Sequence, residues 1–209
     1  GDEDWLEPFR RLAQPFPLGR SLVIDPGEPG SPSPPPASGR RLLRLPARRA
    51  FGVGTHASTR LAVELMERTG MRGKRVLDLG TGTGILAFLA QLEGSRSVVG
   101  LEIDPGAILA AAENRSLNGL APGLVAGSLR CLAPVHLFDL VVANLLPVEL
   151  GPELQELATR LRPGGELIVS GLLQRQEYDL KIALENRGFV VIESSYEEEW
   201  CALTAAFRS

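Results

Sequence analysis

Along most of this chain, segments with the apolar pattern of a buried strand alternate with segments that have the apolar pattern of a helix. Short, nearly continuous apolar runs predict buried strands at residues 75–79, 97–103, 124–126, 138–143, 166–170, 189–193 and about 200–207. Apolar residues three and four positions apart predict helices at residues 57–68, 104–119 and 147–162. Buried strands that alternate with helices indicate an α/β fold with a mostly parallel sheet covered on both faces, and the last two strands are expected to form an antiparallel hairpin.

Residues at two of the helix starts support these boundaries. Asp104 and Pro105 are of the types preferred at an N-cap and at the first helical position. Ser58 or Thr59 is available near the N-cap of the helix over residues 57–68. The helices are therefore delimited by local sequence as well as by apolar spacing.

The first 39 residues differ in composition from the remainder. Residues 3–13 carry a weak helical pattern that Pro8 interrupts. Residues 26–38 are rich in proline, glycine and serine, which favours an exposed linker with polyproline character. We therefore expect an N-terminal extension and linker over residues 1–39 and one globular domain over residues 40–209.

Composition argues against several classes of protein. The 209 residues are 44% hydrophobic and 22% charged, as in an ordinary globular domain, and the formal net charge is −3. No apolar run is long enough to cross a bilayer, and the first residues lack the pattern of a signal peptide, so we expect a cytoplasmic protein with no membrane partner. Cys131 and Cys201 lie far apart without ligand spacing, so neither a disulfide framework nor a metal site is indicated.

One short stretch departs from the acidic average of the chain. It concentrates five arginines, namely Arg40, Arg41, Arg44, Arg48 and Arg49. Such runs usually form a solvated face, and the alternative is contact with an acidic or phosphate-bearing partner such as RNA.

The strongest chemical signal is the segment V-L-D-L-G-T-G-T-G-I-L-A-F-L-A at residues 76–90. An apolar strand containing Asp78 leads into a turn with Gly80, Gly82 and Gly84, and an apolar helix follows. Glycines let the backbone approach a ligand closely, and the helix N-terminus presents unpaired N–H groups to it. A turn of this type favours a nucleotide-like ligand at the carboxyl edge of a parallel sheet.

An acidic residue ends the second strand of the predicted sheet. Glu102 lies about 20 residues beyond the turn, a spacing at which a carboxylate accepts hydrogen bonds from an unphosphorylated ribose. No Gly-Lys-Ser or Gly-Lys-Thr follows the turn, which excludes a P-loop. Two ligands stay open on this evidence, a nicotinamide dinucleotide and S-adenosylmethionine.

Details of the turn favour S-adenosylmethionine. The dinucleotide fingerprint places its third glycine one residue later than Gly84, and Ile85 occupies that packing position. Asp78 adds a carboxylate that suits an ammonium group and is unfavourable beside a pyrophosphate. The alternative is a tight structural turn whose carboxylates are solvated.

A candidate catalytic residue ends the fourth predicted strand, within D-L-V-V-A-N-L-L-P. Asn144 emerges there at the same carboxyl edge as the glycine turn. One role for it is to cap the helix that starts near Pro147. Another is to accept a hydrogen bond from an amine through its amide oxygen and align that amine with a sulfonium methyl group. The two roles are compatible.

These motifs together resemble the bacterial ribosomal protein L-eleven methyltransferase family. The resemblance rests on D-L-G-T-G-T-G from Asp78, E-I-D-P from Glu102 and N-L-L-P from Asn144. It extends to A-F-G-V-G-T-H-A-S-T at residues 50–59, which looks like the family's hallmark loop, and to E-E-W-C-A-L-T-A at residues 198–205, which looks like its C-terminal strand.

The resemblance implies a Rossmann-like class I methyltransferase fold with seven strands. It implies that S-adenosylmethionine is the cofactor and that protein amines, lysine side chains or α-amino groups of a ribosomal protein, are the acceptors. Asn144 is then the catalytic residue. Together with the turn pattern, the matching positions give a candidate cofactor site of His56, Thr59, Asp78, Gly80, Gly82, Gly84, Glu102 and Asn144. Phe51, Gly52 and Gly54 are expected to form a lid.

The sequence also departs from the family's pattern, which leaves other functions open. We expect the family's small N-terminal substrate-recognition domain to be absent, Pro46-Ala-Arg-Arg replaces an acidic-Pro-Gly lead, and Val53 replaces a usual threonine. The alternatives are methylation of a nucleobase or a small-molecule amine, a cofactor-binding module without catalysis, and, least favoured, NAD-dependent oxidoreduction.

Overall fold

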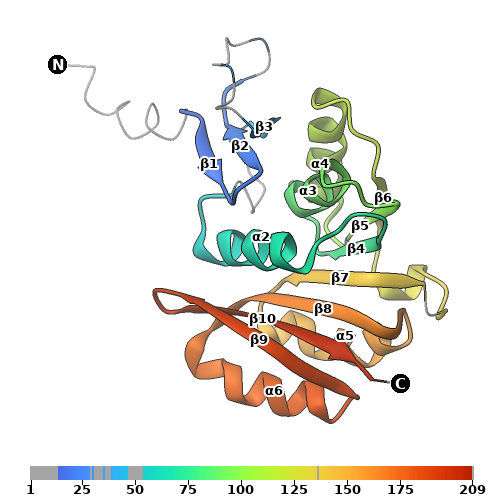
Figure 1. Cartoon of the computed structure of the whole chain (residues 1–209). Coiled ribbons are helices and arrows are strands. Elements are labelled where there is room, and N and C mark those ends of the chain that lie inside the picture. Colours follow the sequence, from blue (N-terminus) through green and yellow to red (C-terminus); the bar gives the residue numbers. More distant parts are fainter. Residues whose placement is uncertain are drawn as a thin grey trace.

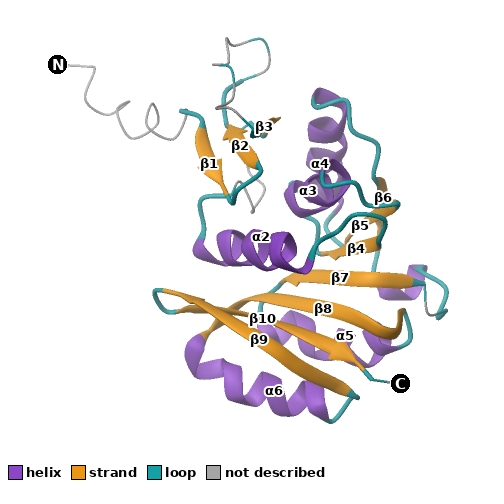
Figure 2. Ribbon diagram, in the orientation of Figure 1, coloured by secondary structure: helices purple, strands orange, loops and turns teal. Residues whose placement is uncertain are grey.

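The computed structural model describes residues 14–28, 30, 35, 39–46, 54–135 and 137–208 of this chain. They form a seven-stranded sheet flanked by helices and a small three-stranded sheet (Figure 1 and Figure 2). The order of the large sheet is β6-β5-β4-β7-β8-β10-β9, in which β10 is antiparallel to β8 and β9 and the other neighbours are parallel. This confirms the predicted α/β class, the seven strands and the antiparallel C-terminal hairpin.

The strands of the large sheet match the predicted runs in order and type. They are β4 Arg75–Leu79, β5 Ser97–Glu102, β6 Gly123–Ala126, β7 Phe138–Asn144, β8 Leu161–Leu173, β9 Phe189–Glu197 and β10 Trp200–Phe207. The helices are α2 Ala57–Thr69, α3 Ile85–Leu92, α4 Pro105–Leu117, α5 Pro147–Ala158 and α6 Glu177–Glu185, with short 3-10 turns η1 Leu129–Cys131 and η2 Gln174–Gln176. None of the helices in the described part of the chain is long and apolar enough to cross a membrane.

The two faces of the large sheet pack against different helices. Successive residues of a strand point to opposite faces, so Val76 of β4 joins the core cluster that contains Leu61 of α2 and Phe88 of α3. Its neighbour Leu77 joins the cluster that contains Leu150 of α5. Figure 1 shows α2 and α3 on one side of the sheet and α5 and α6 on the other. Strands buried on both faces are continuous apolar runs in sequence, which is why the pattern predicted them.

One helix boundary differs from the prediction. The helix predicted over residues 147–162 ends at Ala158, and Leu161 is the first residue of β8. Leu161 is buried as expected, but it packs from a strand, because a single apolar residue fits either pattern near a boundary. The predicted N-cap at Asp104 is confirmed, since its side chain accepts a backbone hydrogen bond in the first turn of α4. The helix predicted over residues 3–13 lies outside the described residues.

The small sheet joins residues on both sides of the expected domain boundary. Its strands are β1 Phe16–Leu18, β2 Leu22–Asp25 and β3 Arg41–Arg44, with β1 antiparallel and β3 parallel to β2. Leu22 and Ile24 are fully buried in the same core cluster as α2 and α3. The expected boundary between residues 39 and 40 therefore falls inside one packed sheet, and residues 16–25 are part of the globular structure. Most of the predicted linker between β2 and β3 lies outside the described residues.

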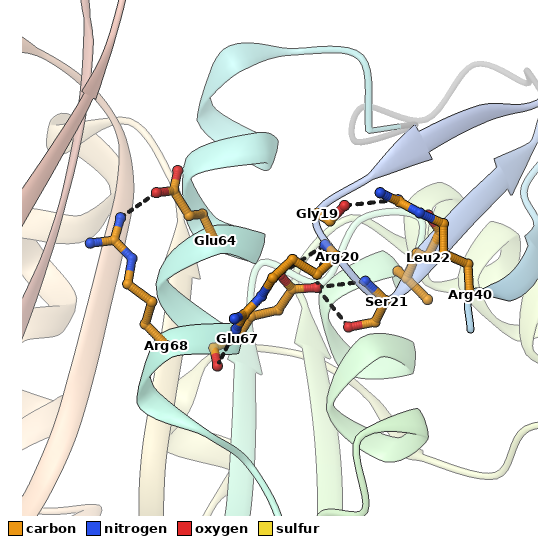
Figure 3. A network of polar contacts seen from close by, with 8 residues as sticks. All are labelled: Gly19, Arg20, Ser21, Leu22, Arg40, Glu64, Glu67 and Arg68. Atoms are coloured by element: carbon orange, nitrogen blue, oxygen red, sulfur yellow. Dashed lines mark hydrogen bonds and ion pairs between the residues drawn. The ribbon is translucent and has the colours of Figure 1, made fainter. Parts of the chain in front are cut away.

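Glu67 of α2 fastens the β1–β2 turn to the helix (Figure 3). Its carboxylate accepts hydrogen bonds from the backbone N–H groups of Arg20 and Ser21 and from the Ser21 hydroxyl, at 2.6–3.0 Å. Gly19 has a φ of 57°, and a Cβ there would lie 2.7 Å from Glu67 Oε1, so a side chain would separate the turn from the helix. Burial raises the pKa of Glu67, but the hydrogen bonds from Ser21 and Arg20 outweigh it and leave that pKa below its ordinary value.

We expect Glu67→Ala to lower the free energy of unfolding by about 1–3 kcal/mol, because partly buried donors lose their acceptor. The folded-state pKa of Glu67 is lowered, so its contribution is full above the unfolded-state pKa and is lost as the pH falls through the folded-state pKa. Urea unfolding at neutral and at acidic pH measures this, and the difference between wild type and E67A should shrink in acid.

The matched control for this prediction is Glu64→Ala. Glu64 lies on the same helix, and its exposed side chain pairs with Arg68. An exposed pair of this kind contributes about 0.3–0.5 kcal/mol. Equal losses of stability in E64A and E67A would contradict the fastening role of Glu67.

Candidate active site

A cavity of about 1000 Å³ opens at the carboxyl ends of β4, β5 and β7. The strand order reverses at β4, because β5 and β7 flank it on opposite sides, and ligands of open α/β sheets bind at such a switch point. The volume is sufficient for a nucleotide-sized ligand. The cavity is lined by His56, Ser58, Thr59, Gly80, Thr81, Gly82, Ile85, Leu86, Glu102, Asp104, Gly106, Ala107, Ala110, Asn144, Leu145, Leu146, Glu149, Gly171 and Trp200.

The glycine turn forms one wall of the cavity. Gly80 has a φ of 74°, and a Cβ on it would lie 2.4 Å from Leu145 Cδ2, so the turn approaches the loop after β7 only because this residue is glycine. Gly82 also lines the cavity, whereas Gly84 does not. Gly84 is the N-cap of α3, and a Cβ there would lie 2.3 Å from Cζ of the buried Phe88. The structure therefore gives Gly84 a packing role, and its predicted cofactor contact stays a prediction.

Glu102 lies where a ribose-binding carboxylate was predicted, at the end of β5. Its Oε2 accepts a hydrogen bond from Gly82 N and its Oε1 accepts one from Asp104 N, each at 3.0 Å. These two bonds fix the carboxylate between the glycine turn and the start of α4. Each oxygen keeps a further lone pair that is available to a ligand hydroxyl.

Asp78 lies behind the glycine turn and is not part of the cavity lining. It is completely buried, and its Oδ2 accepts hydrogen bonds from Thr81 Oγ1 at 2.6 Å and from Ala87 N at 3.0 Å. Burial raises the pKa of Asp78 to about 7, although these two hydrogen bonds oppose the rise. Its observed contacts hold the turn onto α3, so direct contact with a cofactor ammonium group stays a prediction.

Asn144 is the last residue of β7, and its side chain lies at the cavity beside α2. Its Nδ2 donates to Thr59 Oγ1 at 3.4 Å, while its Oδ1 is buried and has no hydrogen-bond partner among the described residues. The N-cap of α5 is Leu146, so Asn144 does not have the capping role. Buried polar atoms are normally paired, which makes this oxygen a ready acceptor for a ligand N–H group.

A second acceptor lies next to the Asn144 amide. Gly171 of β8 has a φ of 87°, and a Cβ on it would lie 2.8 Å from the Leu145 carbonyl oxygen and 3.1 Å from Asn144 Oδ1. The two oxygens therefore border the same small space, which is open because residue 171 is glycine. Two adjacent acceptors suit a ligand nitrogen that carries more than one hydrogen.

His56 and Trp200 add an aromatic pair to the cavity. Their ring centroids are 4.5 Å apart in an edge-to-face arrangement. His56 is also the N-cap of α2, because its Nδ1 accepts a hydrogen bond from Ser58 N, so neither Ser58 nor Thr59 is the cap. Thr59 also lines the cavity, and the predicted cofactor contacts of His56 and Thr59 stay predictions. The predicted lid residues Phe51 and Gly52 lie outside the described residues.

The charged residues of the lining carry one sign. Glu102, Asp104 and Glu149 contribute carboxylates, and no lysine or arginine occurs among the described lining residues. A cavity of this charge favours a cationic ligand and disfavours a pyrophosphate, which normally meets basic groups or free helix N–H groups. The negative charge of the lining agrees with the sequence of the glycine turn, which favours S-adenosylmethionine over a nicotinamide dinucleotide.

No metal site emerges from the described part of the chain, and two of the five clustered arginines contact the small sheet. No group of three or more potential metal ligands occurs there. Arg40 donates hydrogen bonds to the carbonyl oxygens of Gly19 and Leu22 (Figure 3), and Arg44 lies 3.7 Å from Asp25 Oδ2. These two arginines thus contact the small sheet, Arg41 is exposed, and Arg48 and Arg49 lie outside the described residues.

A family model described as "Ribosomal protein L11 methyltransferase" matches residues 1–208, nearly the whole chain. The chain belongs to this family. A ribosomal protein L11 methyltransferase of Geobacter sulfurreducens is 42% identical over 203 residues, which are 97% of this chain and 66% of the relative. The family member of Thermus thermophilus is 36% identical over 206 residues and is covered to 77%. The chain thus spans about two thirds of the length of the first of these L11 methyltransferases.

Solved structures agree with the family assignment. A ribosomal protein L11 methylase of Lactobacillus delbrueckii subsp. bulgaricus superposes with a TM-score of 0.83 at 30% identity, covering 94% of this chain and 98% of that chain. A 16S rRNA methyltransferase of T. thermophilus, solved in complex with AdoMet and guanosine, superposes with a TM-score of 0.64 at 28% identity, covering 76% of this chain and 45% of that chain. The class I methyltransferase fold predicted from the motifs is confirmed.

Sequence reasoning missed part of the cavity wall of this L11 methyltransferase family member. The additional lining residues include Trp200, Glu149, Leu145, Leu146, Gly171 and the start of α4. Trp200 lies in the segment 198–205 that carried the family resemblance, but no local pattern marks Trp200 or Gly171 as facing a ligand. Their position depends on β8 and β10 lying side by side, which only the assembled sheet defines.

Proposed function

We propose that this chain is an S-adenosylmethionine-dependent N-methyltransferase that modifies lysine or α-amino groups of a ribosomal protein. The observation that carries the proposal is the buried Oδ1 of Asn144, which has no hydrogen-bond partner in the described part of the chain and lies at a cavity bordered by the glycine turn and Glu102. Membership of a family named for methylation of a ribosomal protein supports the choice of acceptor. We further propose a cytoplasmic location, the compartment of that acceptor.

The residues present fit the proposed cofactor. Glu102 would hold the ribose hydroxyls, Gly80 and Gly82 would let the backbone approach the amino-acid tail, and Thr59 would contact the ligand beside Asn144. The carboxylate lining suits the positive charges of a sulfonium and an ammonium group. When bound, S-adenosylmethionine supplies a methyl group that is electrophilic because it is attached to a sulfonium.

Asn144 would orient the acceptor for a single in-line displacement. Its Oδ1 and the Leu145 carbonyl oxygen would accept the two N–H bonds of a neutral amine, which leaves the nitrogen lone pair free to face the methyl group. Holding two reactants in line supplies a large part of the rate of such a reaction. The amine reacts in its neutral form, so one proton passes to solvent before attack.

Radiolabelled S-adenosylmethionine provides the direct test. The protein is incubated with purified ribosomal protein L11, and labelled residues are mapped by mass spectrometry. Label on lysine side chains or on the α-amino group is the expected result. Cofactor binding with no transfer to any protein would instead favour a module without catalysis.

A nucleobase is the second candidate acceptor, because one structural relative is a 16S rRNA methyltransferase. The acidic lining and the internal contacts of Arg40 and Arg44 weigh against a polyanionic partner. The same assay with ribosomal RNA in place of protein separates the two. Transfer to RNA that falls steeply with salt would favour this candidate.

We expect S-adenosylmethionine, but not NAD, to raise the melting temperature. At about 100 times its Kd, a ligand of the folded state adds about 2.7 kcal/mol of stability, which corresponds to roughly 5–10 °C for a domain of this size. NAD should leave the melting temperature unchanged, because its pyrophosphate meets no basic side chain among the described lining residues. Differential scanning fluorimetry compares the two ligands, and stabilisation by NAD alone would contradict the cofactor assignment.

A further inference from the structure

We propose that Glu149 is the residue that selects cationic acceptors, by holding the acceptor ammonium group at the mouth of the cavity. This inference rests on the proposed function, since it assigns the acceptor side of the same site. It adds to that function a residue that neither the turn motif nor the Asn144 motif contains.

The position of Glu149 follows directly from the local structure. It is the third residue of α5 and lines the cavity together with Asn144, Leu145 and Leu146, the residues that precede the helix. Its Oε2 accepts a hydrogen bond from Leu146 N at 2.9 Å, and its own N–H donates to Leu146 O at 2.9 Å. This reciprocal cap holds the carboxylate on the segment that directly follows the two acceptor oxygens, at the same cavity.

Glu149 differs from the other two carboxylates of the lining. Glu102 and Asp104 lie at the end of β5 and the start of α4, and both accept backbone hydrogen bonds there. Glu149 comes from the β7–α5 side of the cavity, which also carries Asn144. Within the described residues its side chain makes no hydrogen bond besides the cap and no ion pair, so Oε1 is available to a ligand. The charge therefore lies on the acceptor side, away from the ribose carboxylate.

Two exposed apolar side chains lie next to Glu149 in the chain. Leu146 and Val148 are large hydrophobic side chains with 52% and 77% of their surface exposed, on the same turn as the carboxylate. A lysine side chain combines an apolar stem with a charged end, so it contacts both features at once. A neutral, flat nucleobase would leave the carboxylate without a charged partner. The geometry thus points to an alkylammonium acceptor, and it makes Glu149 a substrate-binding residue.

Glu149→Gln tests the charge without removing the cap, because the glutamine carbonyl oxygen still accepts from Leu146 N. With ribosomal protein L11 as acceptor, we expect KM to rise about three- to tenfold, kcat to change less than about twofold, and the salt dependence of KM to weaken. Calorimetric affinity for S-adenosylmethionine should stay within about twofold. Glu153→Gln is the matched control, because Glu153 lies one turn further along α5 and does not line the cavity.

The outcomes separate this proposal from the proposed function. If wild type methylates L11 and E149Q has the same KM and the same salt dependence, the role of Glu149 is overturned while the proposed function stands. If wild type neither methylates nor binds L11, both are overturned. A purely structural role predicts that Glu149→Ala lowers the melting temperature and that E149Q leaves KM unchanged. The KM of E149Q therefore decides whether Glu149 only caps α5 or also binds the acceptor.

Discussion

Replacing Asn144 with alanine is expected to lower kcat about 100- to 1,000-fold, while the Kd for S-adenosylmethionine changes less than about threefold. The Asn144 amide oxygen is buried without a partner among the described residues and borders the same space as the Leu145 carbonyl oxygen. Its loss leaves the acceptor amine with one orienting contact and does not touch the carboxylate proposed to hold the ribose. Single-turnover methylation of L11 measures the first effect, and calorimetry measures the second.

Two further variants make the prediction on Asn144 specific. Asn186→Ala removes an exposed asparagine at the end of α6 and should leave kcat unchanged. Thr59→Val removes the hydroxyl that accepts from Asn144 Nδ2 and should lower kcat by about tenfold, because the amide loses its orienting contact. Full activity of N144A would remove this residue from the mechanism and leave only a structural role.

The large sheet was predictable because its burial is local in sequence. Strands such as β4 and β7 are covered on both faces, so consecutive residues like Val76 and Leu77 are all apolar and the run is visible without any tertiary knowledge. The end of α5 was not predictable in the same way. Leu161 satisfies both periodicities, and its assignment to β8 depends on pairing with Phe138.

The small sheet escaped prediction for a different reason. Its strands have three or four residues, too few for either periodicity, and residues 26–38 between β2 and β3 are rich in proline and glycine. Leu22 and Ile24 are buried against residues of α2 and α3 that lie far away in sequence, and Glu67 of α2 holds the preceding turn. Local composition indicated an extension, and long-range packing made it part of the core.

The candidate site also contains residues that the sequence could place and residues that depend on long-range packing. Three of its residues lie at the carboxyl ends of neighbouring parallel strands, namely Gly80, Glu102 and Asn144. The order of the elements alone therefore brings them to one edge of the sheet. Trp200 reaches the cavity from β10, the antiparallel strand beside β8, and no spacing rule places it there. Asp78 illustrates the opposite case, since its place in the motif is as predicted but its contacts are with Thr81 and α3.

Glu102→Ala is expected to weaken binding of S-adenosylmethionine by about 100-fold. A fixed carboxylate that accepts two ribose hydroxyls forms charge-assisted hydrogen bonds, each of which contributes about 1.5–3 kcal/mol net of the exchange with water, and a 100-fold loss corresponds to about 2.7 kcal/mol. The same carboxylate accepts from Gly82 N and Asp104 N, so its removal also loosens the turn that borders the ligand. Calorimetry with S-adenosylhomocysteine measures the affinity without turnover.

Asp104→Asn provides the matched control for Glu102. It removes one charge from the same cavity but keeps a good N-cap for α4, because the asparagine oxygen still accepts from Gly106 N. If the cavity bound its ligand only through its overall negative charge, the two variants would weaken binding equally. A Kd within about threefold of wild type in D104N, beside a large loss in E102A, would instead attribute the affinity to hydrogen bonds that ligand hydroxyls donate to the Glu102 carboxylate.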